Sequence, residues 1–357
     1  MPRPPSSAGR EFGSTWRTAG LRIPDGAARL FTSGLALAAA LLAGCSRSAA
    51  PAAGPSAEKV RFKTDWYPEA EDGGFYQALA RDIYRRHALD VEIIPGGPGA
   101  TAQQTLVAGQ ADIAMGRSDD VMVEIAEGLP FLIVAAYFEH DPQGVLVHED
   151  SPVHSFADLN GRTVMAVPGA NWMPYVKSHY HIDFTLIPMN YGVALFMANP
   201  NFIQQCFVTN EPYYVSMKGG HARAMLLSDS GFDPYRVIYT TQRFAREHPG
   251  AVRAFIAASL EGWQDYLDGD PGPADAAIAR RNGNMTLANI LYSRHALTAL
   301  QIARGRPEAG ERLGLLKRQR IEAQAAQLVD LKLIPRTLSL DQVVSFDFLP
   351  PDLAAAR

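Results

Sequence analysis

The sequence predicts an α/β fold built in two lobes. Its 357 residues are enough for two units of ordinary domain size, each with its own hydrophobic core. After Lys59, short stretches with the period of a strand alternate with stretches with the period of a helix. This alternation is typical of a mostly parallel sheet covered by helices on both faces. A net charge of −4 argues against nucleic acid as a partner.

The first set of elements lies between residues 60 and 137. Val60, Phe62, Thr64 and Trp66 alternate with polar residues, which predicts a strand. Helices are expected over 73–87, 101–108 and 121–127, and further strands over 89–94, 111–115 and 131–137.

A second α/β set follows, and then a helical C-terminal region. In the second set, the sequence pattern predicts a short helix over 156–161 and helices over 172–180 and 193–198. It also predicts strands over 163–167, 184–187 and 205–208. From Glu247 onward the pattern is mainly helical.

The N-terminal region has the features of an export signal. Five arginines precede Leu30, and the run from Leu30 to Gly44 is apolar, uncharged and too short to span a bilayer. The start of translation stays open between Met1 and a site nearer Leu30.

Leu42-Ala43-Gly44-Cys45 resembles the lipobox of bacterial lipoproteins. The resemblance implies that residues 1–44 are a lipoprotein signal peptide and that Cys45 is acylated and anchors the chain to a membrane. Ser46 after this cysteine favours the outer membrane where the source has two membranes. Residues 45–58, small and proline-bearing, are expected to be a flexible tether.

Ligands of open parallel sheets sit beyond the carboxyl ends of the strands. Asp65-Trp66-Tyr67, the turn Gly96-Gly97 and Ser118 fall at such ends. Arg117, beside Ser118, suits an anionic ligand group and a structural salt bridge equally well.

Six segments in order resemble the bacterial ABC-importer substrate-binding proteins of the thiamine-pyrimidine and alkanesulfonate (SsuA/THI-like) family. They cover nearly all of the chain after Lys59 and read DWYPEAEDGGFYQA from Asp65, GQADIAMG from Gly109, DLNGRTV from Asp158, CFVTNEPY from Cys206, HPGAVRAF from His248, and LKLIP with FDFLP from Leu331 and Phe346. No single segment is diagnostic, but their order makes the resemblance specific.

The resemblance implies a type II periplasmic-binding-protein fold, with a mostly parallel, helix-flanked sheet in each lobe and a hinge between them. The first lobe would comprise residues 59–144 and 236–357, and the second residues 145–235. It also implies an exported monomer on the periplasmic face that delivers a small ligand to ABC permease and ATPase subunits, with no cofactor.

Within the family, Trp66-Tyr67 and Glu211-Pro212-Tyr213 most resemble the members that bind thiamine-precursor pyrimidines. An aromatic ring at the edge of each lobe would sandwich a flat heterocycle. The expected ligand-binding residues are Asp65, Trp66, Tyr67, Gly96, Gly97, Ser118, Asn171, Trp172, Tyr191, Glu211 and Tyr213. Asp65 and Glu211 would accept hydrogen bonds from ring amino or N–H groups. Core, turn or surface roles remain the alternative for each of these residues.

Other functions remain open. An alkanesulfonate or taurine-type anion would require amide, hydroxyl or arginine donors around its head group. A thiamine-pyrimidine synthase-like enzyme of the same fold would use pyridoxal phosphate and a cysteine-rich iron motif. The chain has two cysteines, Cys45 and Cys206, and the latter is expected to be a small buried apolar residue. No metal site is expected, and a sensor domain is the third alternative.

Overall fold

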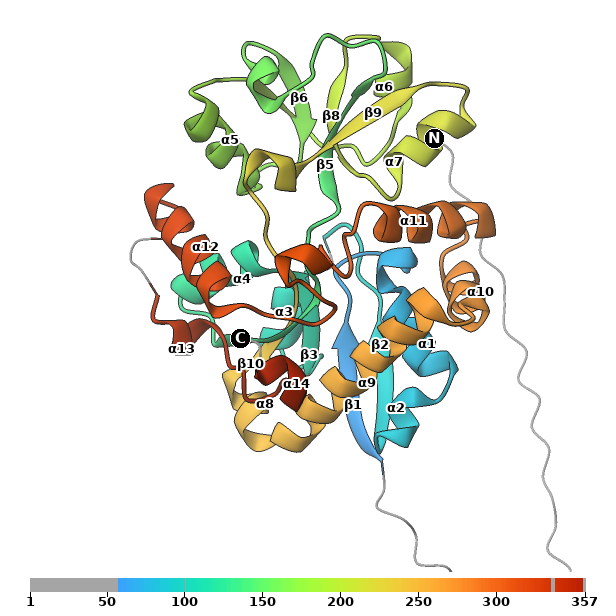
Figure 1. Ribbon diagram of the computed structural model, residues 1–357, viewed down its shortest axis with the longest axis vertical. Coiled ribbons are helices and arrows are strands. Elements are labelled where there is room, and N and C mark those ends of the chain that lie inside the picture. Colours follow the sequence, from blue (N-terminus) through green and yellow to red (C-terminus); the bar gives the residue numbers. More distant parts are fainter. Residues whose placement is uncertain (1–56, 100, 335–337, 356–357) are drawn as a thin grey trace, which may run out of the picture. The chain divides into compact units, whose positions relative to one another are not determined.

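The computed structural model describes residues 57–99, 101–334 and 338–355, so the predicted signal peptide and acylation of Cys45 lie outside the described residues. The described part forms two lobes, each built around a five-stranded sheet (Figure 1). The first lobe holds the N-terminal strands together with the helical C-terminal region, and the second lobe is formed by the middle of the chain.

The first sheet has the strand order β2-β1-β3-β10-β4. Strand β1 pairs in parallel with β2 and β3, whereas β10 runs antiparallel between β3 and β4. The strands are β1 (Glu58–Lys63), β2 (Leu89–Ile94), β3 (Ile113–Arg117), β4 (Phe131–Phe138) and β10 (Arg236–Thr241).

The second sheet has the order β7-β6-β8-β5-β9. Here β6 pairs in parallel with β7 and β8, and β5 runs antiparallel to its neighbours β8 and β9. The strands are β5 (Gln143–His148), β6 (Thr163–Ala166), β7 (Thr185–Pro188), β8 (Ile203–Phe207) and β9 (Ala222–Leu226). Each sheet is therefore mixed, with a single antiparallel strand in an otherwise parallel arrangement.

Helices flank both sheets. In the first half of the chain they are η1 (Ala70–Asp72), α1 (Gly73–Ala80), α2 (Ile83–Arg86), α3 (Ala102–Val107), α4 (Ser118–Ala126), η2 (Phe156–Leu159) and α5 (Trp172–Tyr180), where η denotes a 3₁₀ helix. The remainder are α6 (Ala194–Ala198), α7 (Glu211–Met217), η3 (Leu227–Ser230), α8 (Gln242–Glu247), α9 (Pro249–Asp268), α10 (Gly272–Arg281), α11 (Leu287–Ala299), η4 (Pro307–Ala309), α12 (Arg318–Asp330), α13 (Leu340–Val343) and α14 (Pro351–Ala354).

Two sequence predictions of local structure were wrong in detail. The single helix expected over 73–87 is divided into α1 and α2, because Asp82 adopts a left-handed conformation with φ of 54°. Strands β5, β9 and β10 were not predicted at all. The expected helix over 172–180 is α5, with the same bounds.

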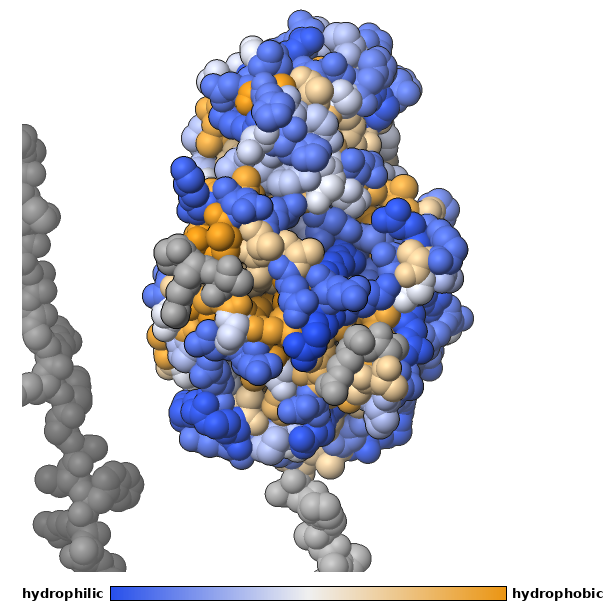
Figure 2. Space-filling model, turned by 60° about the vertical axis from the view of Figure 1, so that its left-hand side comes forward, coloured by the Kyte–Doolittle hydropathy of each residue, from blue (hydrophilic) through white to orange (hydrophobic). Residues whose placement is uncertain are grey.

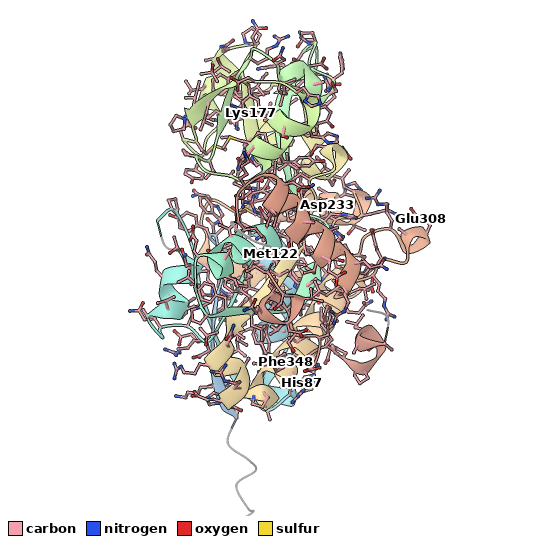
Figure 3. The ribbon with its side chains drawn as sticks, turned by 90° about the vertical axis from the view of Figure 1, so that its left-hand side faces the viewer. His87, Met122, Lys177, Asp233, Glu308 and Phe348 are labelled. Atoms are coloured by element: carbon pink, nitrogen blue, oxygen red, sulfur yellow. The ribbon has the colours of Figure 1, made fainter. Side chains whose placement is uncertain are left out.

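Among the described residues the chain passes between the lobes twice. Residues 139–142 join β4 to β5, and residues 231–235 join η3 to β10. The two passages are tied together, since His140 Nδ1 lies 2.7 Å from Asp233 Oδ2. Arg320 of α12 donates to the carbonyl oxygens of Glu139 at 2.7 Å and Asp233 at 2.9 Å. Asp233 is labelled at the junction of the lobes in Figure 3.

Hydrophilic residues cover most of the face shown in Figure 2, and hydrophobic residues reach the surface mainly on the first lobe. Within the described ranges, no helix combines the length and the apolar character needed to cross a bilayer.

Helices α1 and α9 meet at glycines. A Cβ on Gly262 of α9 would lie 2.3 Å from the carbonyl oxygen of Gly74 and 2.7 Å from the Cβ of Ala78, so even one methyl group has no room there. This close approach seats Trp263 and Phe75 edge to face, with ring centroids 5.8 Å apart.

Gly262→Ala is therefore expected to lower the free energy of unfolding by about 1–3 kcal/mol, because the helices must move apart to admit the methyl group. Gly250→Ala in the same helix is the matched control, since nothing lies within 4 Å of its Cβ position. It is expected to raise stability by about 0.4–1 kcal/mol. Urea unfolding measures both, and equal effects of the two substitutions would contradict the packing argument.

Candidate functional site

A cavity of about 930 Å³ lies between the lobes. The first lobe contributes Trp66, in the loop after β1, and Arg117, the last residue of β3. The second contributes the end of β8, the start of α7 and the loop that carries Tyr191. The site therefore lies where the strands of both sheets end, which is the usual ligand position in open α/β sheets.

Aromatic rings from both lobes meet in this cavity. The ring centroids of Trp66 and Tyr191 are 5.0 Å apart, with their planes tilted by 35°. Tyr67 packs edge to face on Trp66 at 5.5 Å. Tyr67 and Tyr191 are roughly half exposed, at 47% and 52%, so these rings face open space in the cleft. Such a group offers a flat ligand faces to stack on.

Arg236, the first residue of β10, is buried on the cavity wall and already paired. It lies 2.6 Å from Asp65 Oδ2 and 3.7 Å from Asp141 Oδ2, and its Nε donates to the hydroxyl of Tyr137 at 2.8 Å. Two carboxylates thus balance one guanidinium.

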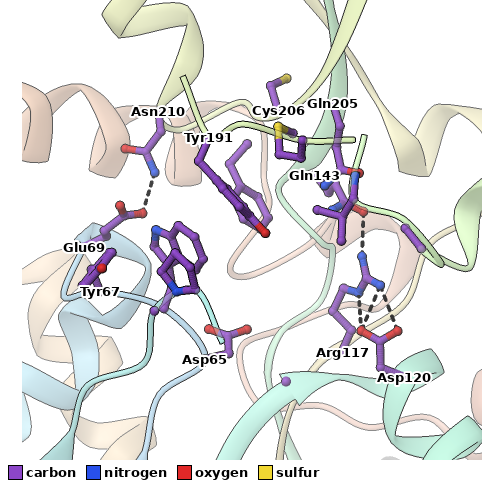
Figure 4. Close-up of a pocket in the computed structure, with 18 of the residues that line it drawn as sticks. Asp65, Tyr67, Glu69, Arg117, Asp120, Gln143, Tyr191, Gln205, Cys206 and Asn210 are labelled. Atoms are coloured by element: carbon purple, nitrogen blue, oxygen red, sulfur yellow. Dashed lines mark hydrogen bonds and ion pairs between the residues drawn. The ribbon is translucent and has the colours of Figure 1, made fainter. Parts of the chain in front are cut away.

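Arg117 is paired in the same way. Its Nε and one terminal nitrogen donate to the two oxygens of Asp120, each at 3.0 Å, and the other terminal nitrogen donates to Gln143 Oε1 at 2.7 Å (Figure 4). Asp119 Oδ1 lies 3.5 Å from Arg117 Nε. Burial raises the pKa of Asp119 to about 7, although Arg117 acts in the opposite direction.

The opposite end of the cavity is acidic. Asn210 donates from Nδ2 to Glu69 Oε2 at 2.7 Å and to Glu71 Oε1 at 3.2 Å. The backbone N–H of Phe207 donates to Glu211 Oε2 at 2.8 Å. Burial raises the pKa of Glu211 to about 7, and burial with neighbouring carboxylates raises the pKa of Glu69 well above its ordinary value. Figure 4 shows Glu69 and Asn210 on the side of the cavity opposite Arg117.

Six of the residues expected from the sequence line this cavity. They are Asp65, Trp66, Tyr67, Gly97, Tyr191 and Glu211. The cavity wall does not include Gly96, Ser118, Asn171, Trp172 or Tyr213.

Three of these five residues have structural contacts that explain their positions. Gly96 donates its N–H to the carbonyl oxygen of Trp66 at 2.9 Å, and a Cβ there would lie 2.4 Å from the backbone of Asp65. Ser118 donates from Oγ to Gln324 Oε1 at 2.7 Å inside the first lobe. Trp172 is fully buried in the core of the second lobe.

The other two lie beside the cleft. Tyr213 packs against Tyr292 of α11, with ring centroids 5.5 Å apart. Asn171 connects the lobes, because its Nδ2 donates to Asp119 Oδ2 and Asp120 Oδ1 of α4, each at 3.0 Å.

The sequence analysis missed much of the polar wall. The additional lining residues with polar side chains include Glu69, Asp120, Glu124, Gln143, Gln205, Asn210, Tyr214, Lys218, Arg236 and Tyr239. Glu69 and Asn210 are adjacent or nearly adjacent to predicted residues, so a wider window around the same motifs would have included them. Gln143 and Arg236 begin strands that the sequence pattern did not predict.

The described residues contain no group of three or more histidine, cysteine, aspartate or glutamate side chains placed to hold a metal ion. Cys206 is buried on the cavity wall, and burial raises the pKa of its thiol well above the ordinary value.

Residues 70–272 match the family model described as NMT1/THI5 like. The chain belongs to this family. The match includes most residues of the cavity wall and both passages between the lobes.

Two curated relatives cover parts of the chain. A putative thiamine biosynthesis protein of Haemophilus influenzae is 28% identical over 107 residues, which is 30% of this chain and 34% of that protein. The riboflavin-binding protein RibY of Chloroflexus aurantiacus is 23% identical over 233 residues, 61% of this chain and 65% of that protein. The chain thus spans about one third of the length of the Haemophilus protein and just under two thirds of the length of the Chloroflexus protein.

Solved structures confirm the predicted fold class. The alkanesulfonate-binding protein SsuA of Xanthomonas axonopodis pv. citri, bound to MOPS, has a TM-score of 0.61 at 15% identity, over 83% of this chain and all of that one. A Candida albicans protein with the generic periplasmic binding protein fold has a TM-score of 0.55 at 13% identity, over 80% and 96%. The desulfurization enzyme DszB has a TM-score of 0.54 at 13% identity, over 84% and 100%.

Asn171→Ala is expected to shift the ligand-free protein toward a more open arrangement, because hydrogen bonds to charged groups contribute about 1.5–3 kcal/mol and both join the lobes. Small-angle X-ray scattering would show a larger radius of gyration than in the wild type. Asn199→Ala serves as the control, since within the described part of the chain Asn199 Oδ1 accepts just the local N–H of Asn201, at 2.9 Å. Unchanged scattering of the Asn171 variant would contradict a role in closure.

Proposed function

We propose that this protein is an exported solute-binding component of an ABC importer that captures a small planar nitrogen heterocycle by closing its two lobes. The observation that carries the proposal is the contact between the rings of Trp66 from the first lobe and Tyr191 from the second, whose centroids lie 5.0 Å apart on the cavity wall. Family membership and the shared fold support the class of protein.

The ring pair suits a flat guest. Stacked or tilted aromatic pairs have centroids 4.5–7 Å apart and gain about 0.5–1.5 kcal/mol beyond area burial. Because Trp66 and Tyr191 belong to different lobes and are already in contact, a flat ligand that packs against both rings would contact both lobes at once. Such a ligand favours the closed form because it makes contacts with both lobes there that it cannot make in the open form.

The polar wall supports a ligand rich in hydrogen-bond donors over an alkanesulfonate, which is the second candidate. A sulfonate requires donors that are free to bind it. The guanidinium groups of Arg117 and Arg236 each contact two carboxylates, and carboxylates also line the opposite end of the cavity. Asp65 and Glu211 are then acceptors for ring amino or N–H groups.

The cargo we favour is a thiamine-precursor pyrimidine, in keeping with the name of the Haemophilus relative. The name of the Chloroflexus relative adds riboflavin as a larger planar heterocycle. A cavity of about 930 Å³ is at the upper end of the roughly 300–1,000 Å³ typical of small-molecule sites, so it has room for either.

The proposal includes a monomer that is held at the periplasmic face by acylation of Cys45, with the outer membrane favoured, and that delivers its ligand to a permease and ATPase. The proposal also states that the protein binds its ligand without converting it to a product. Because the fold also occurs in the enzyme DszB, turnover of any bound compound by the purified chain would contradict the proposal.

Trp66→Ala is expected to weaken binding of the preferred heterocycle at least about tenfold, which corresponds to about 1.4 kcal/mol of lost stacking and burial. Trp66→Phe keeps a ring in place and should retain most of the affinity. Isothermal calorimetry with thiamine-precursor pyrimidines, riboflavin, taurine and longer alkanesulfonates measures both variants. Binding of sulfonates alone, unaffected by Trp66→Ala, would reverse the order of the two candidates.

Cys45→Ser is expected to release the protein from the membrane fraction and to abolish incorporation of labelled palmitate, because a diacyl anchor on this thiol gives stable attachment. Cys206→Ser is the matched control, since Cys206 is the second of two cysteines and is buried in the cavity wall. It should keep both the label and the membrane association. Labelling that survives Cys45→Ser would refute the anchor.

A further inference from the structure

We propose that the ligand is bound as a cation, with its positive charge at the end of the cavity formed by Glu69, Asn210 and Glu211, which we name the acidic end. The inference rests on the proposed function, because it specifies the charge of the heterocycle that the same site captures.

The acidic end contains one buried oxygen acceptor, on Asn210, that lacks a protein donor. Asn210 is only 5% exposed, and both hydrogen bonds of its amide leave through Nδ2 toward Glu69 and Glu71. Its Oδ1 is buried and has no hydrogen-bond partner among the described residues. A buried acceptor without a donor costs about 1–3 kcal/mol, so a ligand that donates there restores a missing interaction.

The two arginines of the cavity wall are paired with other carboxylates. Arg236 balances Asp65 and Asp141, and Arg117 balances Asp119 and Asp120. Lys218 follows the C-terminal end of α7, about two turns beyond Glu211, and is exposed. The acidic end therefore carries carboxyl groups in excess of the positive charges near it.

Aromatic faces complete a site for an organic cation. Tyr214, one turn of α7 from Asn210, lines the cavity, and its hydroxyl is fixed by Asn289 Nδ2 at 2.8 Å. Trp66 and Tyr191 lie across the same space. A delocalised cation over such rings gains about 0.5–1 kcal/mol at exposed sites and about 2 kcal/mol or more when desolvated.

Charge balance makes binding of a cation depend on pH. The titratable groups around Glu211 are Glu69 and Glu71 of the first lobe and Cys206 and Tyr214 of the second lobe, to which Glu211 belongs. Burial raises the pKa of Glu211 to about 7. A bound cation favours the carboxylate form, so binding releases protons near neutral pH. The affinity for a permanent cation accordingly rises as the pH increases from 6 to 8.

The test compares 4-aminopyrimidine with its ring-N-methylated cation at pH 8, where the parent is uncharged. We expect the wild type to bind the cation at least about tenfold more tightly. Calorimetry at pH 7 in two buffers of different ionisation enthalpy should show release of protons with the cation. Glu211→Gln should remove most of this preference, since the amide oxygen still accepts from Phe207 but carries no charge.

Glu69→Gln provides a second variant with the same expectation, and Glu127→Gln, exposed on the first lobe, is the matched control with wild-type preference. Thermal unfolding reports whether each variant is folded. Equal or weaker binding of the cation by the wild type would overturn the inference. Tight binding of riboflavin that Glu211→Gln leaves unchanged would also overturn it while supporting the proposed function, whereas binding of sulfonates alone would overturn both.

Discussion

The buried guanidinium of Arg236 is the contact on which the arrangement of the site depends. It joins Asp65 at the end of β1, Tyr137 at the end of β4 and Asp141 in the first passage between the lobes, while Arg236 itself begins the strand that follows the second passage. Removing one partner of a buried ion pair typically costs about 3–5 kcal/mol, because the other charge is left without compensation. One side chain thereby fixes both connections relative to the cavity wall.

This pairing also determines the electrostatic character of the cavity. A guanidinium on the wall of a binding site is commonly the partner of an anionic ligand, and the sequence left that role open for Arg117. In the structure Arg117 and Arg236 each contact two aspartates, so their charge stabilises the protein and is not free for a ligand. What the cavity offers instead is carboxylate and amide oxygen between aromatic rings.

The sequence predicted those features that depend on local pattern. The strand and loop from Val60 to Tyr67 and the helix Trp172–Tyr180 follow from periodicity, and Tyr191 and Glu211, both expected in the ligand site, line the cavity. Strand β10 was missed because its short run follows a connection without regular structure and leads directly into helical sequence. Arg236, the first residue of this strand, was therefore not predicted as a residue of the site.

Other errors in the predicted site residues arose because neighbouring residues of one helix lie on different faces of it. Trp172 and Asn171 are neighbours at the start of α5, yet one side chain is fully buried in the lobe and the other reaches the opposite lobe. Tyr213 and Tyr214 differ in the same way, since only Tyr214 lines the cavity. Adjacent residues of a helix point in directions about 100° apart, so a motif identifies the segment but not which of its side chains faces the ligand.

The contacts between the lobes indicate how selectivity arises. On one side of the cavity Asn171 donates to Asp119 and Asp120, and on the other Thr209 and Asn210 donate to Glu69 and Glu71. Closure therefore gains hydrogen bonds that do not involve the ligand. A ligand shifts the equilibrium only by what it binds more tightly in the closed form, and here that difference comes from rings and carboxyl groups that two separate lobes bring together. A compound that contacts one wall alone would occupy the cleft without favouring closure.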